Sequence, residues 1–211
     1  GGINFTASHN PAEYNGIKFS TANGAPALPD VTKQIESLIS NPPATSPPAA
    51  AGSVEHADLR ATYLEELARK VNLDAIRASG LGLIYDPLYG TGRGYLDGLL
   101  AHAGIPLLTI HDRRDVLFGG HPPEPADEYL HPLRDAMAEK GARLGLSTDG
   151  DADRFGILDE GGGFISPNHI LRWDPGGSLR SRHLGMSVPG CRTHDRRGTG
   201  PTRRESLRMS L

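Results

Sequence analysis

Short apolar runs alternate with helix-like segments between residues 81 and 148, and this alternation most limits the folds open to the chain. Each apolar run has the length of a buried strand, and each intervening segment has apolar residues at helical spacing. Successive strands in this order must pair in parallel, because each helix returns the chain to the same end of the sheet. The predicted strands are 81–86, 105–111 and 142–148, and the predicted helices are 95–104 and 126–141.

A Gly-rich turn at residues 160–163 lies between two further strand-like segments. These segments, 155–159 and 163–166, predict an antiparallel hairpin. Parallel strands and a hairpin within one sheet make that sheet mixed. The expected fold class is therefore α/β, with α/β/α layered domains and mixed sheets.

Four prolines and several small residues fill the segment 42–53, which predicts a semi-extended linker and a domain boundary. An amphipathic helix is predicted on either side of this linker. The first covers 31–39, with Asp30 as its N-cap, and the second covers 57–77.

The last part of the chain differs in composition from the rest. Residues 174–211 contain eight Arg, no Lys and three acidic residues, in a chain whose formal net charge is −3. The same stretch lacks Ile, Phe, Tyr and Trp and has no periodic apolar positions. We therefore expect the Arg-rich tail at 172–211 to be disordered or to be out-of-frame sequence. The chain also starts with Gly rather than Met, which suggests that it begins partway through a longer protein.

The overall composition excludes several classes of protein. With 22 basic and 25 acidic residues, the chain has no basic field that would attract nucleic acid. One Cys cannot build a disulfide framework or a Cys-based zinc site. No apolar run approaches the ~20 residues that span a membrane, and no secretory signal is visible. We expect a cytoplasmic protein without nucleic-acid or membrane partners, whose oligomeric state the sequence leaves open.

Three aspartates, Asp149, Asp151 and Asp153, follow the predicted strand 142–148, and Arg154 comes next. Carboxylates at alternate positions of a tight loop converge and repel one another, and a hard cation such as Mg²⁺ or Ca²⁺ removes the repulsion. Arg154 would add a fixed positive charge suited to a phosphate. An EF-hand is excluded because its sixth position must be Gly, but a Ca²⁺ site and a solvated acidic turn remain alternatives.

A second polar cluster lies near the start, in the segment Thr-Ala-Ser-His-Asn-Pro at 6–11. Ser8 can act as a nucleophile or carry a phosphate, and His9 and Lys18 are candidate proton carriers or phosphate partners. The alternative is a turn in which hydroxyl side chains cap the local backbone. Mg²⁺ prefers few carboxylates together with phosphate oxygens. The two clusters would therefore support phosphoryl transfer if they meet across a domain interface.

Together these motifs resemble the phosphoserine loop and the metal loop of the α-D-phosphohexomutase superfamily, which includes phosphoglucomutases and phosphomannomutases. The resemblance covers residues 1–171. It implies that Ser8 is phosphorylated and that Lys18 is a general acid/base, with His9 and Arg154 as active-site partners. It also implies a Mg²⁺ ion, whose ligands would be Asp149, Asp151, Asp153 and the phosphate on Ser8.

The resemblance further implies a partial domain I at 1–41 and a nearly complete domain II at 54–171, followed by the tail. The implied activity interconverts hexose 1-phosphate and hexose 6-phosphate through the phosphoserine and a bisphosphate intermediate, with a phosphosugar as substrate. Since the sugar-reading loop and the fourth domain of the family find no match here, we expect weak or no turnover by this chain alone. Two alternatives stay open: an inactive fragment that only binds Mg²⁺ and phosphate, and a Ca²⁺-stabilised binding module.

Overall fold

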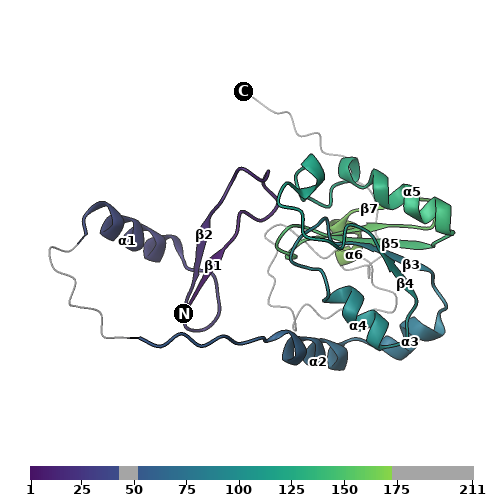
Figure 1. The fold of residues 1–211 in the computed structure, drawn as a ribbon, viewed down its shortest axis with the longest axis horizontal. Coiled ribbons are helices and arrows are strands. Elements are labelled where there is room, and N and C mark those ends of the chain that lie inside the picture. Colours follow the sequence, from purple (N-terminus) through teal and green to yellow (C-terminus); the bar gives the residue numbers. More distant parts are fainter. Residues whose placement is uncertain (43–51, 173–211) are drawn as a thin grey trace, which may run out of the picture. The chain divides into compact units, whose positions relative to one another are not determined.

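The computed structural model describes residues 1–42 and 52–172 (Figure 1). The predicted linker at 42–53 lies mostly outside the described residues, as does all but the first residue of the predicted tail at 172–211. Within the described ranges, every helix is too short or too polar to cross a membrane.

A five-stranded mixed sheet organises the larger part of the described chain, with the strand order β4-β3-β5-β6-β7. Strand β3 pairs in parallel with both β4 and β5, and the β5–β6 and β6–β7 pairs are antiparallel. This arrangement confirms the predicted mixed sheet and the hairpin after it. The strands are β3 (Leu83–Asp86), β4 (Leu107–Thr109), β5 (Leu144–Thr148), β6 (Phe155–Leu158) and β7 (Phe164–Ile165).

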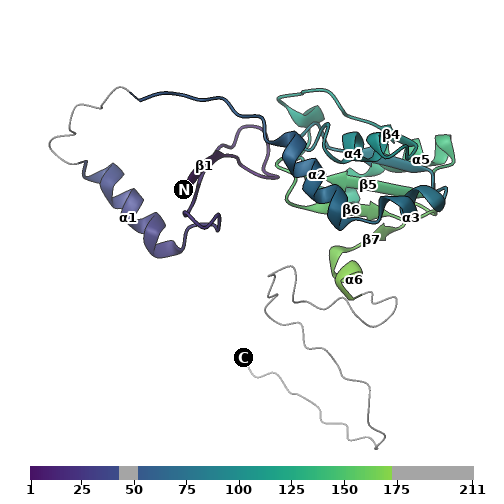
Figure 2. The same ribbon diagram turned by 90° about the horizontal axis from the view of Figure 1, so that it is seen from below.

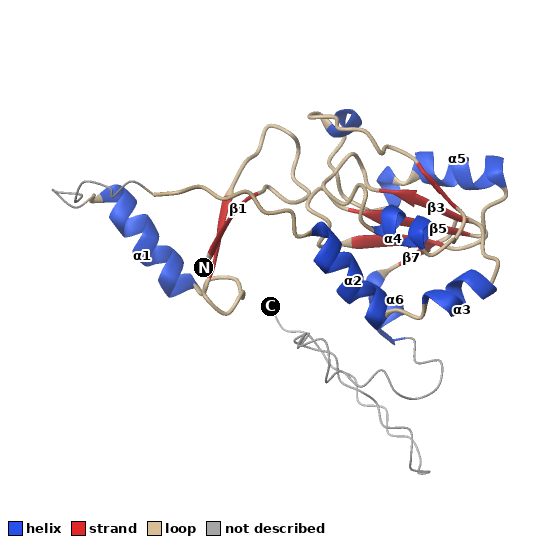
Figure 3. Ribbon diagram, turned by 60° about the horizontal axis from the view of Figure 1, so that its bottom comes forward, coloured by secondary structure: helices blue, strands red, loops and turns tan. Residues whose placement is uncertain are grey.

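Helices cover both faces of this sheet (Figures 1 and 3). Leu83 and Ile84 are neighbours on β3, so their side chains point to opposite faces. On one face, Ile84 packs against α5 (His131–Lys140) in a cluster with Leu130, Leu133, Met137 and Leu158. On the other face, Leu83 packs with Leu100 of α4 (Leu96–His102) and with Ile105. The three layers of the predicted α/β/α domain follow from this alternation.

The two helix predictions on either side of the linker were wrong in detail. The predicted helix 57–77 is two helices, α2 (Arg60–Lys70) and α3 (Leu73–Ala78), because the Asn72 side chain accepts a hydrogen bond from the Ala75 amide at 3.0 Å and starts a new helix. Helix α1 (Pro29–Ser40) begins after Leu28, so Asp30 lies inside its first turn rather than at the N-cap. Proline at the first helical position explains this start, since it lacks an N–H and already has a helical φ.

The end of α5 agrees with the sequence prediction, because Gly141 closes the helix with a φ of 64°. Its start does not: a short 3₁₀ turn, Asp127–Tyr129, precedes the helix where a continuous helix from 126 was predicted. A second 3₁₀ turn, Phe118–Gly120, follows β4, and the short helix α6 (Pro167–Arg172) follows β7.

The first part of the chain forms a two-stranded antiparallel sheet, in which β1 (Gly2–Phe5) pairs with β2 (Ile17–Ser20) (Figure 1; β1 is also labelled in Figure 2). Strand β1 is exposed along its whole length, and helix α1 buries none of its residues. The loop between the strands is closed at its base by a hydrogen bond from the Thr6 amide to the Gly16 carbonyl, at 3.0 Å. This loop carries Ser8.

The carboxyl ends of the parallel strands position the acidic loop. The connection through α4 takes the chain from β3 to one neighbour, β4, and the connection through α5 brings it back to the other neighbour, β5. Open α/β sheets bind ligands where the strand order reverses in this way. At this point the Thr91 amide, after β3, donates to the Gly150 carbonyl, after β5, at 3.0 Å. The loop that carries the aspartates therefore begins at a strand end that hydrogen bonds hold in place.

Tyr85 on β3 predicts how the stability of this unit depends on alkaline pH. It is 1% exposed, its hydroxyl lies 2.7 Å from Thr148 Oγ1, and burial raises its pKa from 10.0 to about 12. The unfolded chain then loses this proton at lower pH than the folded chain. The contribution of the neutral Tyr85 side chain to the free energy of unfolding is therefore complete below pH 10. It falls by about 2 to 3 kcal/mol as the pH rises toward 12.

Denaturant unfolding of the chain and of Tyr85→Phe, measured from pH 9 upward, checks this expectation. The variant should be about 1 kcal/mol less stable at neutral pH, because it lacks the hydrogen bond to Thr148, and should lose less stability with rising pH. Tyr14→Phe, at an exposed tyrosine, is the matched control and should follow the wild type. Equal alkaline slopes for Tyr85→Phe and the wild type would contradict the assignment to Tyr85.

Candidate active site

The Ser8 loop holds its serine in an unusual backbone conformation. Ser8 has a φ of 55°, a value that residues other than Gly, Asn and Asp rarely adopt. Its amide donates a hydrogen bond to Thr6 Oγ1 at 2.9 Å, and the Asn10 amide donates to the Ala7 carbonyl at 3.0 Å. Backbone strain of this kind persists where the surroundings hold it, and it is concentrated at functional sites.

The acidic loop is the tight connection between β5 and β6. The Arg154 amide donates to Asp149 Oδ1 at 2.9 Å, and the Ala152 amide donates to the Asp149 carbonyl at 3.1 Å. Ala152 has a φ of 62°, which lets the chain reverse within a few residues. As a result, Asp149, Asp151 and Asp153 each offer a carboxylate oxygen within 4.8 Å of the other two.

The two loops, 141 residues apart in sequence, meet at Ser8. Its hydroxyl oxygen lies 3.2 Å from Asp149 Oδ2 and 3.2 Å from Asp151 Oδ1. A hydroxyl has one proton, so these two contacts share a single donor. Thr6 adds a third link, because its hydroxyl donates to Asp151 Oδ2 at 2.9 Å.

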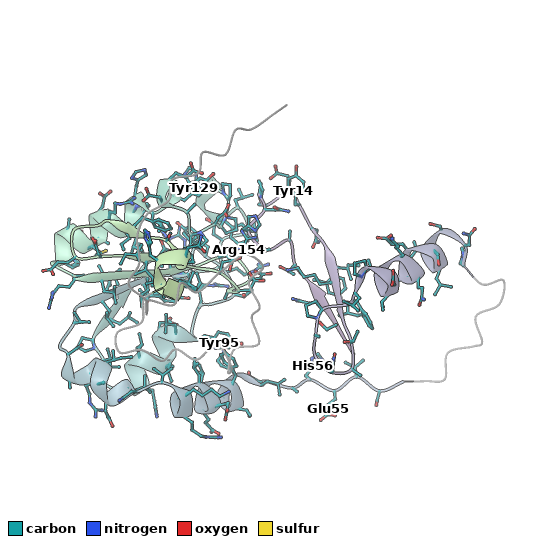
Figure 4. All side chains as sticks on the ribbon, turned by 180° about the vertical axis from the view of Figure 1, so that it is seen from behind. Tyr14, Glu55, His56, Tyr95, Tyr129 and Arg154 are labelled. Atoms are coloured by element: carbon teal, nitrogen blue, oxygen red, sulfur yellow. The ribbon has the colours of Figure 1, made fainter. Side chains whose placement is uncertain are left out.

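The other predicted site residues surround this junction at different distances. Lys18 Nζ lies 3.4 Å from Asp151 Oδ2 and 4.0 Å from Asp153 Oδ2. His9 Nδ1 lies 3.4 Å from Ser8 Oγ. Arg154, labelled in Figure 4, instead forms an ion pair with Glu124, with 3.1 Å between Nη1 and Oε1. Both partners of that pair are partly exposed, so it contributes little to stability.

The acidic loop fits a divalent cation. Asp149 is fully buried, and burial raises its pKa; the Arg154 amide opposes this, while the Asp151 and Asp153 carboxylates add to it. Burial also tends to raise the pKa of Asp151, but hydrogen bonds from Thr6, Asp149 and Ser8, together with Lys18, lower it overall. The cluster thus holds carboxylates that repel one another at the end of a strand. An all-oxygen donor set of this kind suits a hard ion such as Mg²⁺.

An open cavity of about 670 Å³ adjoins the Ser8 loop. Its walls include Ser8, Tyr14 and Asp151, together with Arg93 and Arg114 from loops after β3 and β4. Its volume is in the range of small-molecule binding sites. The candidate proton carriers His9 and Lys18 do not line this cavity, and neither does Arg154.

Sequence reasoning missed three residues of the site. Thr6 lies within the Thr-Ala-Ser-His-Asn-Pro motif, and a Thr hydroxyl that bonds the backbone two residues on is a known turn pattern that could have indicated its contact with Ser8. Glu124 lies in a Pro-rich segment, and only the folded chain brings it to Arg154. Gly150 lies between two of the aspartates, and the close backbone contacts around it require a glycine there.

Gly150 allows the two loops to approach each other. A Cβ added at this position would lie 2.6 Å from the Ser8 carbonyl oxygen and 3.0 Å from Pro123 Cγ. Neither neighbour is the end of a flexible side chain. Gly150→Ala should therefore separate the loops and weaken Mn²⁺ binding about tenfold or more, a loss of about 1.4 kcal/mol or greater.

Titration of the chain with Mn²⁺, followed by electron paramagnetic resonance, measures this effect. Gly98→Ala in α4 is the control, because a Cβ there meets nothing within 4 Å, and it should bind Mn²⁺ like the wild type. The predicted role of Gly150 would be wrong if both alanine variants bound Mn²⁺ equally well.

Comparison with known families agrees with this geometry. Residues 1–45 match the family described as phosphoglucomutase/phosphomannomutase, alpha/beta/alpha domain I, and residues 61–162 match its alpha/beta/alpha domain II. The chain is 35% identical to a protein of known crystal structure from Thermus thermophilus, with a TM-score of 0.69 over 80% of this chain and 38% of that one.

Curated relatives extend the likeness. The chain is 36% identical over 168 residues to the "Probable phosphoglucosamine mutase" of Methanobrevibacter smithii, covering 79% of this chain and 37% of the relative. It is 31% identical over 189 residues to the "Phosphoglucomutase/phosphomannomutase" of Thermococcus kodakarensis, covering 89% of this chain and 41% of the relative. The chain thus spans about two fifths of the length of these relatives. Its two matched domains and these relatives show that the chain belongs to the α-D-phosphohexomutase superfamily.

Proposed function

We propose that this chain supplies the phosphoserine and metal-binding parts of a phosphohexomutase. The whole enzyme would interconvert hexose 1-phosphate and hexose 6-phosphate through a hexose bisphosphate. The observation that carries this proposal is the contact of Ser8 Oγ with both Asp149 and Asp151, at 3.2 Å each. That contact favours a reacting serine over a serine that only caps its own turn.

In the proposed reaction, Ser8 Oγ forms a bond to phosphorus as the bond from phosphorus to the sugar oxygen breaks. The Ser8 proton passes to a neighbouring base, and the released sugar oxygen takes up a proton. Asp149, Asp151 and Asp153 would hold Mg²⁺ beside Ser8. When bound, the ion would neutralise charge on the phosphoryl group.

Lys18 and His9 are the proposed proton carriers. His9 Nδ1 lies 3.4 Å from Ser8 Oγ, and Lys18 Nζ lies 3.4 Å from Asp151 Oδ2. Arg154 would offer its guanidinium to the phosphoryl group once it leaves Glu124, since planar guanidinium groups bind phosphate by two parallel hydrogen bonds.

The proposed substrate is a phosphosugar. The relatives include a phosphoglucosamine mutase and a phosphoglucomutase/phosphomannomutase, so the proposed class is a hexose phosphate. The division into part of domain I at 1–41 and domain II at 54–171 is part of the same proposal. Because the matched relatives are more than twice as long as the aligned region, full mutase turnover is proposed only for the whole enzyme.

Intact-mass analysis of the chain after incubation with glucose 1,6-bisphosphate and Mg²⁺ tests the transfer step. We expect the mass of one added phosphoryl group, located on Ser8 by peptide mapping. Chelation of Mg²⁺ should prevent the addition, and Asp151→Asn should slow it about tenfold or more, because the variant loses a charged ligand.

Ser8→Ala should take up no phosphoryl group, whereas Ser20→Ala, at a serine on β2, should behave like the wild type. Phosphorylation that persists in Ser8→Ala would contradict the proposal. Mg²⁺ and phosphate binding without transfer would favour an inactive binding fragment. Tight Ca²⁺ binding without any response to Mg²⁺ or phosphate would favour a Ca²⁺-stabilised module.

A further inference from the structure

We propose that Thr6 is a positioning residue, whose single hydroxyl group orients both the reactive Ser8 and the proposed metal-binding carboxylate of Asp151. This inference rests on the proposed function and assigns a role to a residue that is neither a nucleophile nor a metal ligand. Thr6 is partly buried at the base of the Ser8 loop, and its backbone is held by the hydrogen bond from its own amide to the Gly16 carbonyl.

The Thr6 hydroxyl has two partners with opposite requirements. The Ser8 amide can only donate, and it lies 2.9 Å from Thr6 Oγ1. The Asp151 carboxylate, when ionised, can only accept, and its Oδ2 lies 2.9 Å from the same oxygen. The single hydroxyl proton must therefore point to Asp151 while an oxygen lone pair faces Ser8. This defines one orientation for all three groups.

The accepting side of the hydroxyl acts on Ser8. The serine has a φ of 55°, which costs free energy unless neighbouring groups hold it. Thr6 Oγ1 satisfies the Ser8 amide in that conformation, and the conformation in turn directs Ser8 Oγ to Asp149 and Asp151. Without this acceptor, the strained conformation of Ser8 is less stable, and Ser8 Oγ is no longer held toward the two carboxylates.

The donating side of the hydroxyl acts on Asp151. The Thr6 hydroxyl donates to Oδ2 of this carboxylate, and Ser8 Oγ contacts Oδ1. The two hydroxyls of the loop therefore contact both carboxylate oxygens. When Ser8 is esterified it no longer has a hydroxyl proton, and its hydrogen bonds to the aspartates end. The Thr6 hydrogen bond does not depend on that proton. It would therefore keep Asp151 oriented in both the free and the phosphorylated states.

Replacement of Thr6 by Val and by Ser separates the hydroxyl from the rest of the side chain. Val keeps the branched shape and removes the hydroxyl, whereas Ser keeps the hydroxyl and removes the methyl group. Thr21→Val is the matched control, because Thr21 follows the same hairpin and its hydroxyl bonds within its own turn, to Asn23 and to the Ala25 carbonyl.

Two measurements on the full chain report the effect: the rate of Ser8 phosphorylation by glucose 1,6-bisphosphate and the affinity for Mn²⁺. Thr6→Val should lower the maximal phosphorylation rate by roughly 10- to 100-fold, the range expected for losing a hydrogen bond to a charged group. The bisphosphate concentration at half-maximal rate should change little, since the Thr6 hydroxyl already uses its proton for Asp151 and accepts from the Ser8 amide. Mn²⁺ affinity should fall several-fold, and Thr6→Ser and Thr21→Val should stay within about threefold of the wild type for both measurements.

The proposal is overturned if Thr6→Val matches the wild type in both measurements, or if Thr6→Ser is impaired as strongly as Thr6→Val. The second result would assign the effect to packing of the methyl group. If the wild-type chain takes up no phosphoryl group, the proposed function fails, but the Mn²⁺ affinities still test Thr6. If the wild-type chain binds no Mn²⁺, both proposals fail.

Discussion

The meeting of an aspartate cluster with one serine hydroxyl, which contacts Asp149 and Asp151, is the interaction on which the rest of the site depends. Asp149, Asp151 and Asp153 lie within 4.8 Å of one another, and Asp149 is fully buried. Such a cluster is unfavourable unless cations and hydrogen-bond donors compensate it. The donors come from the Ser8 loop and the strand after it, namely Thr6, Ser8 and Lys18. The negative charges of the aspartates therefore attract the Ser8 loop, which is distant in sequence, to the end of β5.

The sheet supplies the rigidity that this arrangement needs. Parallel pairing of β3 and β5 brings their carboxyl ends together, and the absence of side chains at two glycines lets the following loops touch. A Cβ on Gly90 would lie 2.7 Å from the Gly150 carbonyl oxygen, and one on Gly150 would lie 2.6 Å from that of Ser8. Small residues thus connect the core of the sheet to the Ser8 loop through a chain of close backbone contacts.

The sequence predicted the layered fold because strand length and helical spacing are local properties. The parallel strands and the hairpin after Asp159 are confirmed, and so is Gly141 as a helix end. The break at Asn72 was not predicted, because the apolar stripe is continuous through it. A single side chain, Asn72, caps α3 and ends the continuous helix. Motif spacing selected Ser8 and the aspartates, whose roles stay predictions. The contact of Thr6 with Asp151 and that of Glu124 with Arg154 could not be predicted from it, because they join segments that only folding brings together.

The most direct test of the central claim is the distance between the phosphorus on Ser8 and the bound metal. Phosphoserine can be incorporated at position 8, the chain loaded with Mn²⁺, and the ³¹P coupling measured by electron–nuclear double resonance. The account predicts a strong ³¹P coupling from a phosphoryl oxygen bound directly to the ion, and its loss when Asp149 and Asp151 are replaced by Asn. Mn²⁺ bound at the aspartates without any ³¹P coupling would contradict the account.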